Sequence, residues 1–407
     1  MRTNDRITLT HAVSLSLYLV AAAIFVSTLA PPDRAQAQEV RRQVAPKAIL
    51  ELGGNRVEAP FKIVARHILV DVFINDQGPF PFVFDTGAGL TAIDKKLADR
   101  LGLKEAGQAR VGDATTSGAQ TASIYKLDQI RLGSAKWSSG SCVGLDLGEL
   151  YEGEPDHPLG IVGISLFADC LVTVDYPKNR IVMETGELPE PDGKSVLACD
   201  YKMGLPSIKC ELAGKSLELT FDTGAALSMA LAESQKGDVP LKGELKTVGI
   251  SKRLNTEEKV NEARAAGDLT LGTFHVRNPR LTYAGVRSIM GYDVLKNFVL
   301  TFDRKNQRVR LQAADQPLDV VPRVTAGFGT KFVDGGRKVR YVLPGLAADQ
   351  AGVKVDDEIT ALDGKPCKDW TRGALRERLE TPGKLRLDLK RGDQTIKATL
   401  EVAVVVP

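Results

Sequence analysis

The chain has 407 residues, which is enough for two to four domains. Its 54 lysines and arginines nearly balance its 51 aspartates and glutamates, and the formal net charge of +3 does not indicate nucleic acid or an anionic membrane surface as a partner. The four histidines have no metal-ligand spacing, which disfavours zinc, Ser-His and Cys-His catalysis. No glycine-rich phosphate loop joins a strand to a helix, so we expect neither a cofactor nor a metal.

The N-terminus has the pattern of an export signal. Arg2 and Arg6 give a positively charged start, residues 12–30 are largely apolar, and Ala-Gln-Ala at 35–37 supplies small residues for cleavage. We therefore predict a signal peptide over residues 1–37 and a secreted or periplasmic protein. The apolar run is nearly long enough to span a bilayer, so the alternative is an uncleaved inner-membrane anchor with the folded part facing the periplasm.

The next segments are rich in β-strand signals. Apolar runs at 70–75 and 80–84 flank turn residues 76–79 and predict two consecutive strands. The second strand runs into Phe-Asp-Thr-Gly-Ala at 84–88, and a short helical pattern follows at 92–101. An aspartate in a tight Thr-Gly turn at the end of an apolar strand is a suitable place to hold a catalytic carboxylate.

The same pentapeptide returns unchanged at 221–225, 137 residues further along the chain. Other segments repeat in the same order: a Leu-Gly pair, an apolar run ending in glycine (Gly163 and Gly291), and a strand ending in Val-Asp or Phe-Asp. A repeat this long predicts two homologous, mostly β lobes. We place them at residues 38–188 and 194–312, with the short linker 189–193 between them.

The first lobe contains about eleven more residues than the second before Gly163. The stretch 148–158 is acidic, contains proline and glycine, and accounts for these residues, so we expect it to be a surface loop. The glycines at 163 and 291 permit close backbone approach, which would let each strand pass behind an aspartate turn.

Two matched aspartate turns indicate two carboxylates at one site. A like-charged pair that shares one proton is the chemistry of an aspartic peptidase. The alternative is a structural turn that a domain duplication copied without a catalytic purpose. The intact motif in both copies favours the catalytic interpretation, because a purely structural turn has no need to hold two carboxylates together.

The tandem turns, each followed by an apolar-apolar-Gly segment, resemble the retropepsin-like aspartic peptidases over about residues 60–311. The resemblance implies two β-barrel lobes that form a pseudo-dimer within one chain. It also implies that Asp85 and Asp222 are the catalytic pair and bind the attacking water between them.

Four further residues have roles that the resemblance implies. Thr86 and Thr223 would interlock beneath the aspartates through hydroxyl hydrogen bonds, while Gly87 and Gly224 would donate backbone N–H groups to the carboxylates. Flaps over the cleft are expected at residues 109–123 and 248–263.

The expected reaction is hydrolysis of peptide bonds in an extended polypeptide substrate. One ionised carboxylate acts as general base towards water, and the protonated one hydrogen-bonds the scissile carbonyl oxygen. Two alternatives keep the fold. One is a catalytically silent, exported peptide-binding or scaffold protein. The other is an active enzyme whose lobes pair between two chains.

Residues 314–317 mark a boundary, and the segment 318–407 has a different character. Leu-Pro-Gly-Leu-Ala-Ala at 343–348, followed by Ala-Gly-Val and Leu-Asp-Gly-Lys, resembles a PDZ domain of the bacterial protease-associated kind. The resemblance implies a small α+β barrel with a helix at 371–379 beside a groove that captures an extended peptide ligand by strand addition. The position of the carboxylate-binding loop is occupied by residues 326–329, Ala-Gly-Phe-Gly. This order departs from the usual Gly-apolar-Gly-apolar, which argues against binding of a terminal carboxylate. Alternatively, the PDZ fold serves packing or regulation alone.

The arginines of the C-terminal segment and the cysteines of the chain support two further expectations. The arginines of the expected PDZ helix, Arg372, Arg376 and Arg378, indicate its solvated face. Five cysteines in an exported chain leave at least one unpaired. The candidate bridges are Cys199–Cys210 and Cys142–Cys170, with Cys367 left over; buried free thiols are the alternative.

Overall fold

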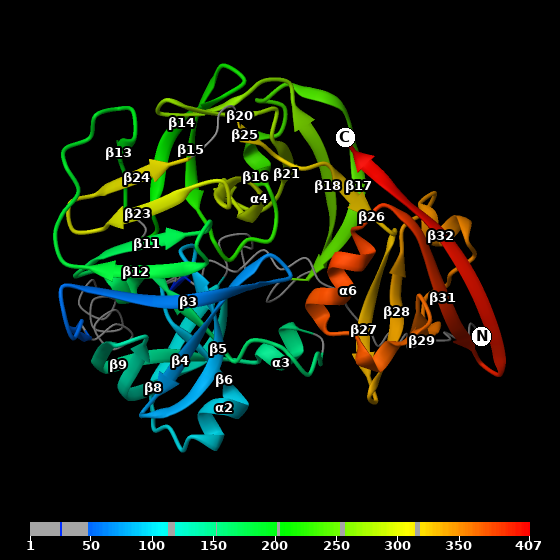
Figure 1. Ribbon diagram of the computed structural model, residues 1–407, viewed down its shortest axis with the longest axis horizontal. Coiled ribbons are helices and arrows are strands. Elements are labelled where there is room, and N and C mark those ends of the chain that lie inside the picture. Colours follow the sequence, from blue (N-terminus) through cyan, green and yellow to red (C-terminus); the bar gives the residue numbers. More distant parts are fainter. Residues whose placement is uncertain are drawn as a thin grey trace, which may run out of the picture.

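The computed structural model describes residues 25–26, 48–112, 119–151, 153–201, 204–252, 257–313 and 318–407. Apart from strand β1 (Phe25–Val26), the predicted signal peptide lies outside these residues, as does the predicted boundary at 314–317. Within the described ranges, no helix is both long and apolar enough to cross a membrane. Figure 1 shows a blue-to-cyan lobe below a green-to-yellow lobe, with an orange-to-red unit at one side.

The first lobe is built mainly from strands, as expected. Its elements are β2 (Ile49–Glu51), β3 (Arg56–Val64), β4 (His67–Ile74), β5 (Gln77–Asp85), β6 (Ala92–Asp94), α2 (Lys95–Arg100), β7 (Glu105–Gly112), β8 (Ala119–Leu132), β9 (Ala135–Leu145), α3 (Leu147–Leu150), β10 (Gly160–Gly163), η1 (Ile164–Phe167), β11 (Leu171–Asp175) and β12 (Arg180–Glu184).

The second lobe repeats the central part of this order. Its elements are β13 (Val196–Ala198), β14 (Ser207–Leu212), β15 (Lys215–Phe221), β16 (Met229–Leu231), η2 (Glu233–Gln235), β17 (Leu241–Lys252), β18 (Glu257–Ala265), β19 (Leu269–Leu271), β20 (Phe274–Arg277), β21 (Arg280–Tyr283), β22 (Ile289–Met290), α4 (Tyr292–Leu295), β23 (Val299–Asp303) and β24 (Arg308–Gln312).

The C-terminal unit has a sheet of its own. Its elements are β25 (Leu318–Asp319), which pairs with β20 of the second lobe, and β26 (Arg323–Thr325), β27 (Phe328–Val333), β28 (Gly336–Val342), α5 (Ala347–Gln350), β29 (Glu358–Leu362), β30 (Lys365–Pro366), η3 (Cys367–Asp369), α6 (Arg372–Leu379), β31 (Gly383–Arg391) and β32 (Gln394–Val406). The strands follow the order β26-β32-β31-β29-β28-β27, which leaves β27 at the edge. The helix predicted at 371–379 is confirmed as α6, and the Thr371 hydroxyl caps it by accepting from the Ala374 N–H at 3.3 Å.

The hairpin that leads to the first aspartate differs slightly from the prediction. Its turn lies at Asn75 and Asp76, one residue earlier than expected, and β5 already begins at Gln77. Both turn residues have positive φ, 48° and 62°, which asparagine and aspartate tolerate better than most residues. The Asn75 side-chain oxygen also accepts the backbone N–H of Asp128 at 3.1 Å, which anchors the turn to β8.

The two lobes share one continuous layer of strands. It runs β3-β12-β11-β23-β24-β13, so strands of the first lobe pair directly with strands of the second. At its centre, Thr173 on β11 lies opposite Thr301 on β23, and their hydroxyl oxygens are 2.9 Å apart. These threonines occupy equivalent positions of the repeat, 128 residues apart. An approximate twofold axis therefore passes between the lobes of a single chain.

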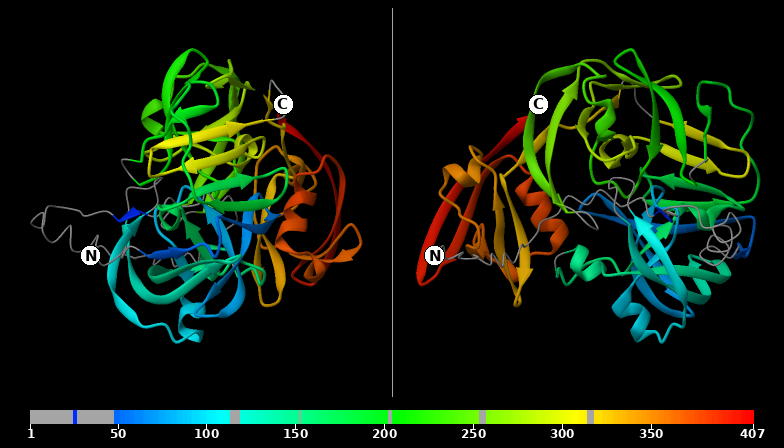
Figure 2. Two further views of the ribbon diagram at one scale, coloured as in Figure 1. Left: turned by 60° about the vertical axis from the view of Figure 1, so that its left-hand side comes forward. Right: turned by 180° about the vertical axis from the view of Figure 1, so that it is seen from behind.

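The packing of the insertion at 148–158 contradicts the prediction of a surface loop. Tyr151 is 2% exposed and Glu154 is 4% exposed. The stretch lies against the C-terminal unit, whose Arg337 forms an ion pair with Glu154. The acidic composition that suggested solvent exposure instead complements basic side chains of another domain. Figure 2 shows this unit beside the junction of the two lobes in both further views.

The five cysteines are all free in the structure, so neither candidate disulfide is formed. Four of them are buried, and Cys210 is half-buried. Burial raises the pKa of the Cys199 and Cys210 thiols to about 12, and that of Cys367 to about 11. The buried free thiol is thus the interpretation that the structure supports.

Candidate active site

Each aspartate turn is supported from behind by a glycine-terminated strand, as predicted. Strand β10 runs parallel to β5 and places Gly163 opposite Asp85. A Cβ on Gly163 would lie 2.4 Å from the Leu90 carbonyl oxygen, and a Cβ on Gly291 would lie 2.6 Å from the Ala225 carbonyl oxygen. Only glycine allows the backbones to approach this closely, so both predicted close approaches are confirmed.

The two turns interlock through their threonines. The Thr86 hydroxyl donates to the Phe221 carbonyl at 2.7 Å and accepts the Thr223 N–H at 3.1 Å. In the reverse direction, the Thr223 hydroxyl donates to the Phe84 carbonyl at 2.9 Å and accepts the Thr86 N–H at 3.0 Å. Both threonines are fully buried. The predicted interlock is therefore confirmed within one chain, and each lobe fixes the position of the other lobe's turn.

The carboxyl groups of Asp85 and Asp222 face each other above this interlock. Asp85 Oδ1 accepts the Gly87 N–H at 2.8 Å. A Cβ on Gly87 would lie 2.4 Å from the carboxyl carbon of Asp222, so the glycine of one turn makes room for the aspartate of the other. Backbone N–H groups of Ala225 and Gly224 favour the ionised form of Asp222, because they lower its pKa.

Burial dominates the electrostatics of the pair. Asp85 is 0% exposed and Asp222 is 1% exposed. Burial raises the pKa of Asp85 to about 7, against the hydrogen bond from Gly87. Burial also raises the pKa of Asp222 well above its ordinary value, and the neighbouring charge of Asp85 raises it further. Two facing carboxyls of this kind retain one shared proton up to near-neutral pH and titrate as a unit.

One oxygen of each carboxyl group has no hydrogen-bond partner outside the pair. Asp85 Oδ2 and Asp222 Oδ1 are buried and no other described residue hydrogen-bonds them, whereas the two side chains hydrogen-bond each other. Buried acceptors without partners are costly unless they serve a ligand or a proton. The described residues contain no group of three side chains suited to a metal ion. The arrangement can accept a proton from a bound water and donate one to a carbonyl oxygen.

Two tyrosines near the pair are not predicted by the sequence. Burial raises the pKa of Tyr151 to about 12, with Arg372 acting in the opposite direction and the charge of Asp85 raising it further. Burial raises the pKa of Tyr176 well above its ordinary value, and its hydroxyl has no hydrogen-bond partner among the described residues. Nothing in the local sequence marks either tyrosine, because long-range packing alone brings them to the site.

The insertion of the first lobe connects this site to the C-terminal unit. The Arg372 guanidinium lies over the Tyr151 ring, 4.6 Å from its centroid. The Arg372 backbone N–H, at the start of α6, donates to Asp156 at 3.1 Å. Arg372 is 4% exposed, so the prediction that it lies on a solvated helix face is wrong. The sequence shows a charged helix face but does not show that another domain covers it.

Arg376, one turn further along α6, bridges both lobes. Its guanidinium donates to the Ala65 carbonyl of the first lobe at 2.9 Å and to the Ala226 carbonyl of the second lobe at 3.3 Å. Ala226 directly follows the second Phe-Asp-Thr-Gly-Ala turn. A similar bridge comes from Arg66, which pairs with Glu380 at 2.6 Å and with Asp293 at 3.5 Å. The helix therefore lies at a three-way junction next to the aspartates.

The expected flaps correspond to two hairpins, β7–β8 and β17–β18, whose tips lie outside the described residues. The hairpin of the second lobe contacts the C-terminal unit. Lys246 Nζ donates to the Val405 carbonyl on β32 at 3.0 Å, and Glu257 forms an ion pair with Arg340 on β28. A small apolar cluster joins the same surfaces; it contains Val248, Val260 and Val406.

Comparisons with known proteins agree with this architecture. Residues 70–166 match the family model described as aspartyl protease, and residues 319–390 match the PDZ domain. A protein of Synechocystis sp. (strain ATCC 27184 / PCC 6803 / Kazusa) named putative serine protease HhoA is 42% identical over 71 residues. That stretch covers 17% of this chain and 18% of HhoA, so the chain spans less than a fifth of this relative's length. The chain is thus a mostly β, protease-like protein with an aspartyl-protease-like region and a C-terminal PDZ domain.

Proposed function

We propose that the protein is an exported aspartic endopeptidase that uses Asp85 and Asp222 to hydrolyse peptide bonds. The observation that carries this proposal is the reciprocal hydrogen bonding of Thr86 and Thr223, which holds two buried carboxyl groups face to face. Keeping two like-charged groups together in a buried site is costly. A protein that only binds peptides has no use for this arrangement.

The proposed mechanism needs only the shared proton and a water molecule. The ionised carboxylate takes a proton from the water as its oxygen attacks the carbonyl carbon of the substrate. The protonated carboxyl group hydrogen-bonds the carbonyl oxygen and stabilises the developing negative charge. When the C–N bond breaks, a carboxyl proton passes to the leaving amine. The products are a carboxylic acid and an amine, and the pair again shares one proton.

The substrate that fits this site is an extended polypeptide. The carboxyls lie at the junction of two lobes, each of which contributes a hairpin in the position of a flap. A segment lying across the junction would contact both hairpins, and closure over it would exclude water from the reaction. Peptide binding also agrees with the PDZ domain, since such domains bind peptides in general.

The decisive test uses the purified chain without its first 37 residues and a mixed peptide library read by mass spectrometry from pH 3 to pH 9. Asp85→Asn and Asp222→Asn are each expected to reduce cleavage by about 10³-fold or more, because either change removes the acid–base pair. Asp71→Asn is the matched control, since Asp71 is exposed on β4. A statine-type inhibitor is expected to block the wild-type activity.

Each alternative predicts a different result. A scaffold protein shows no inhibitor-sensitive cleavage at any pH. A serine-dependent enzyme keeps its activity in both asparagine variants and loses it with a serine-directed acylating reagent. An enzyme that pairs its lobes between chains regains activity when the two inactive variants are mixed, whereas the arrangement within one chain predicts no such complementation.

Export is part of the proposal, and it rests on the signal-like residues 1–37. Expression of the full chain in a Gram-negative host, followed by fractionation, is expected to give a periplasmic protein whose N-terminus lies near Gln38. Recovery of the uncleaved chain with the inner membrane would favour the anchored alternative. Recovery from the cytoplasm would contradict export.

A further inference from the structure

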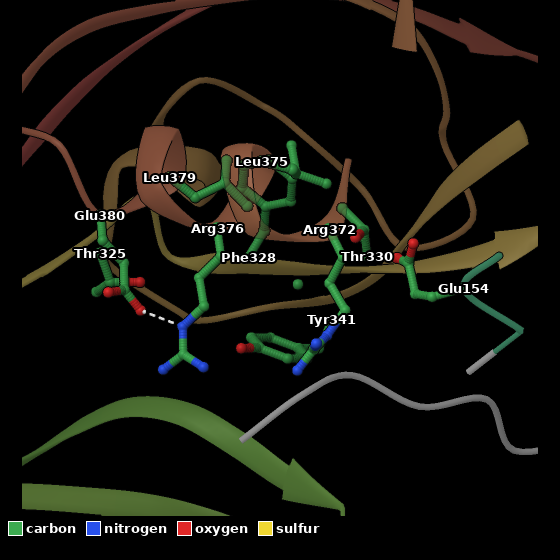
Figure 3. Close-up of a pocket in the computed structure, with 11 residues that line it drawn as sticks. Glu154, Thr325, Phe328, Thr330, Tyr341, Arg372, Leu375, Arg376, Leu379 and Glu380 are labelled. Carbon is green, nitrogen blue, oxygen red and sulfur yellow. Dashed lines mark hydrogen bonds and ion pairs between the residues drawn. The ribbon is translucent and has the colours of Figure 1, made fainter. Parts of the chain in front are cut away.

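The PDZ domain has a groove between the edge strand β27 and helix α6 (Figure 3). Phe328 on β27 and Leu375 and Leu379 on α6 line it with apolar surface. Among the described residues, β27 pairs with β28 and forms the outermost strand of its sheet. An edge strand beside a helix is the geometry that takes up an extended peptide by main-chain pairing.

One end of this groove is unsuited to a chain-terminal carboxylate. The Ala326 N–H already donates to the Leu379 carbonyl at 2.9 Å, and the Gly327 N–H donates to the Thr325 hydroxyl at 3.1 Å. The Glu380 carboxylate also lines this end. It is kept ionised by Arg376, Arg66 and Arg323, which lower its pKa against the effect of burial. An entering α-carboxylate would meet used N–H groups and a like charge.

The other end of the groove carries Arg372. Its side chain is more than nine-tenths buried, and its Nε and Nη1 atoms have no hydrogen-bond partner among the described residues. Its Nη2 lies 3.5 Å from His67 Nδ1, a long contact. A buried guanidinium with unused donors is costly, and its planar fork matches a carboxylate. Figure 3 shows Arg372 and Arg376 projecting from α6 towards Tyr341.

The acidic groups around Arg372 act on it only from a distance: Asp156 and Glu154 oppose the lowering of its pKa by burial, but neither forms an ion pair with its guanidinium. Glu154 lines the same end of the groove but forms a buried ion pair with Arg337. Asp156 is exposed to solvent and accepts the backbone N–H of Arg372 rather than its side chain. Tyr151 meets the guanidinium with its ring face, and burial raises its pKa to about 12, so it stays neutral. No carboxylate among the described residues forms an ion pair with the Arg372 side chain.

We propose that this groove binds an extended peptide segment through an internal Asp or Glu side chain that pairs with Arg372. The ligand is a stretch within a polypeptide rather than its C-terminus. The groove lies beside the junction of the lobes. Arg372 of the groove contacts the ring of Tyr151, and Tyr151 is close enough to Asp85 for the charge of Asp85 to raise its pKa. Binding at the groove stands independently of cleavage; the identification of the bound segment as part of a substrate rests on the proposed endopeptidase activity.

The test measures binding in the signal-free Asp85→Asn protein, so that no peptide is cleaved. The probes are fluorescein-labelled decapeptides with capped ends on a Val-Ser-Ala background, with one Glu moved through positions 3 to 8. Matched peptides carry Gln at the same positions, and another carries a free C-terminal carboxylate and no Glu. Fluorescence anisotropy is expected to show about tenfold tighter binding for at least one Glu peptide than for its Gln counterpart.

Variants test whether the preference for Glu over Gln depends on Arg372. Arg372→Gln is expected to abolish the Glu-over-Gln preference, whereas Lys384→Ala, at a side chain that is 75% exposed, leaves it unchanged. If Arg372→Gln fails to fold, Thr330→Glu, at a half-buried side chain that lines the same end of the groove, puts a negative charge there and is expected to remove binding of the Glu peptide. Raising the salt concentration should reduce the preference in the parent protein.

Three results would overturn the proposal. They are equal binding of Glu and Gln peptides at every position, tighter binding of the peptide with the free C-terminus, and a Glu preference that persists in Arg372→Gln. The two proposals fail separately. A Glu preference without any cleavage by the wild-type chain would contradict the proposed endopeptidase activity and support peptide binding at the groove. Cleavage without a Glu preference would support the endopeptidase activity and contradict the proposed role of the groove.

Discussion

The two lobes are alike where they meet each other and differ where they meet the PDZ domain. Both end a strand in Phe-Asp-Thr-Gly-Ala, and both support that turn with a glycine strand. The first lobe alone carries the insertion 148–158, whose Tyr151 and Glu154 contact the PDZ domain. The second lobe contacts the same domain with the β17–β18 hairpin. Each lobe therefore has its own surface for the third domain.

This comparison separates two kinds of constraint. The shared parts form four buried hydrogen bonds across the twofold axis, and a change in one lobe affects the other directly. In the described part of the chain, the insertion 148–158 and the β17–β18 hairpin make no such bonds across the axis. Substitutions in these two segments therefore affect the position of the PDZ domain. The symmetric part holds the carboxyl pair, and the asymmetric part determines what lies beside it.

The largest expected effect tests the symmetry of the interlock. Thr86→Val and Thr223→Val each leave a backbone N–H and a carbonyl of the opposite lobe buried without a partner. We expect each change to lower the free energy of unfolding by about 4 kcal/mol, since each unsatisfied group costs about 1–3 kcal/mol. Chemical denaturation measures this, with Thr→Ser at the same positions as the control that keeps the hydroxyl. Losses that differ by more than about 2 kcal/mol between the lobes would contradict equivalent roles.

The next effect concerns the insertion. Glu154→Ala leaves Arg337 buried without its ion-pair partner, because both side chains are nearly inaccessible. We expect a loss of about 3 kcal/mol, as is usual when one partner of a buried pair is removed. Glu401→Ala is the matched control, since its pair with Lys384 is exposed, and it should change stability by less than about 0.5 kcal/mol. Equal effects of the two changes would show that the insertion does not hold the PDZ domain.

The smallest expected effect is a pH dependence of stability. The folded pKa of Asp85 is about 7, above its ordinary value of 3.8, so the folded chain binds a proton that the unfolded chain releases between these values. Its stabilising contribution is complete below about pH 4 and is lost as the pH rises through 7. Asp85→Asn removes the contribution of Asp85 to this loss and leaves that of Asp222, so its Tm should exceed that of the wild type by about 3 °C at pH 8. A Tm difference that is the same at pH 4 and pH 8 would contradict the raised pKa.

The sequence predicted the symmetric part well. The repeated pentapeptide and the matched glycines report local requirements: a turn after a strand, and a position where a Cβ would collide with a carbonyl oxygen. Both requirements are visible in short stretches of sequence, and the duplication presents each of them twice. The placement of Thr86 and Thr223 could therefore be inferred before any contact was known.

The asymmetric part could not be predicted, because it depends on contacts between distant segments. The insertion looked like a loop, since its acidic residues, glycine and proline are typical of one. Arg372 looked like an exposed helix residue, because helical spacing places it on the charged face. The insertion and Arg372 both have the polar character that is typical of a protein surface. They are buried because the insertion and the helix that carries Arg372 pack against each other.

The strand layer shared by the lobes has a practical consequence for work with this protein. Residues 189–194 between the lobes are exposed, whereas β11 and β23 pair along their length across the axis. A protease nick in this connection would cut one peptide bond and leave that pairing intact. The chain could then be produced as two fragments, one ending and one beginning near residue 191, that assemble on mixing. Such a split protein would allow one half to be isotopically labelled for NMR, so that the signal of each aspartate could be followed separately while the pair titrates.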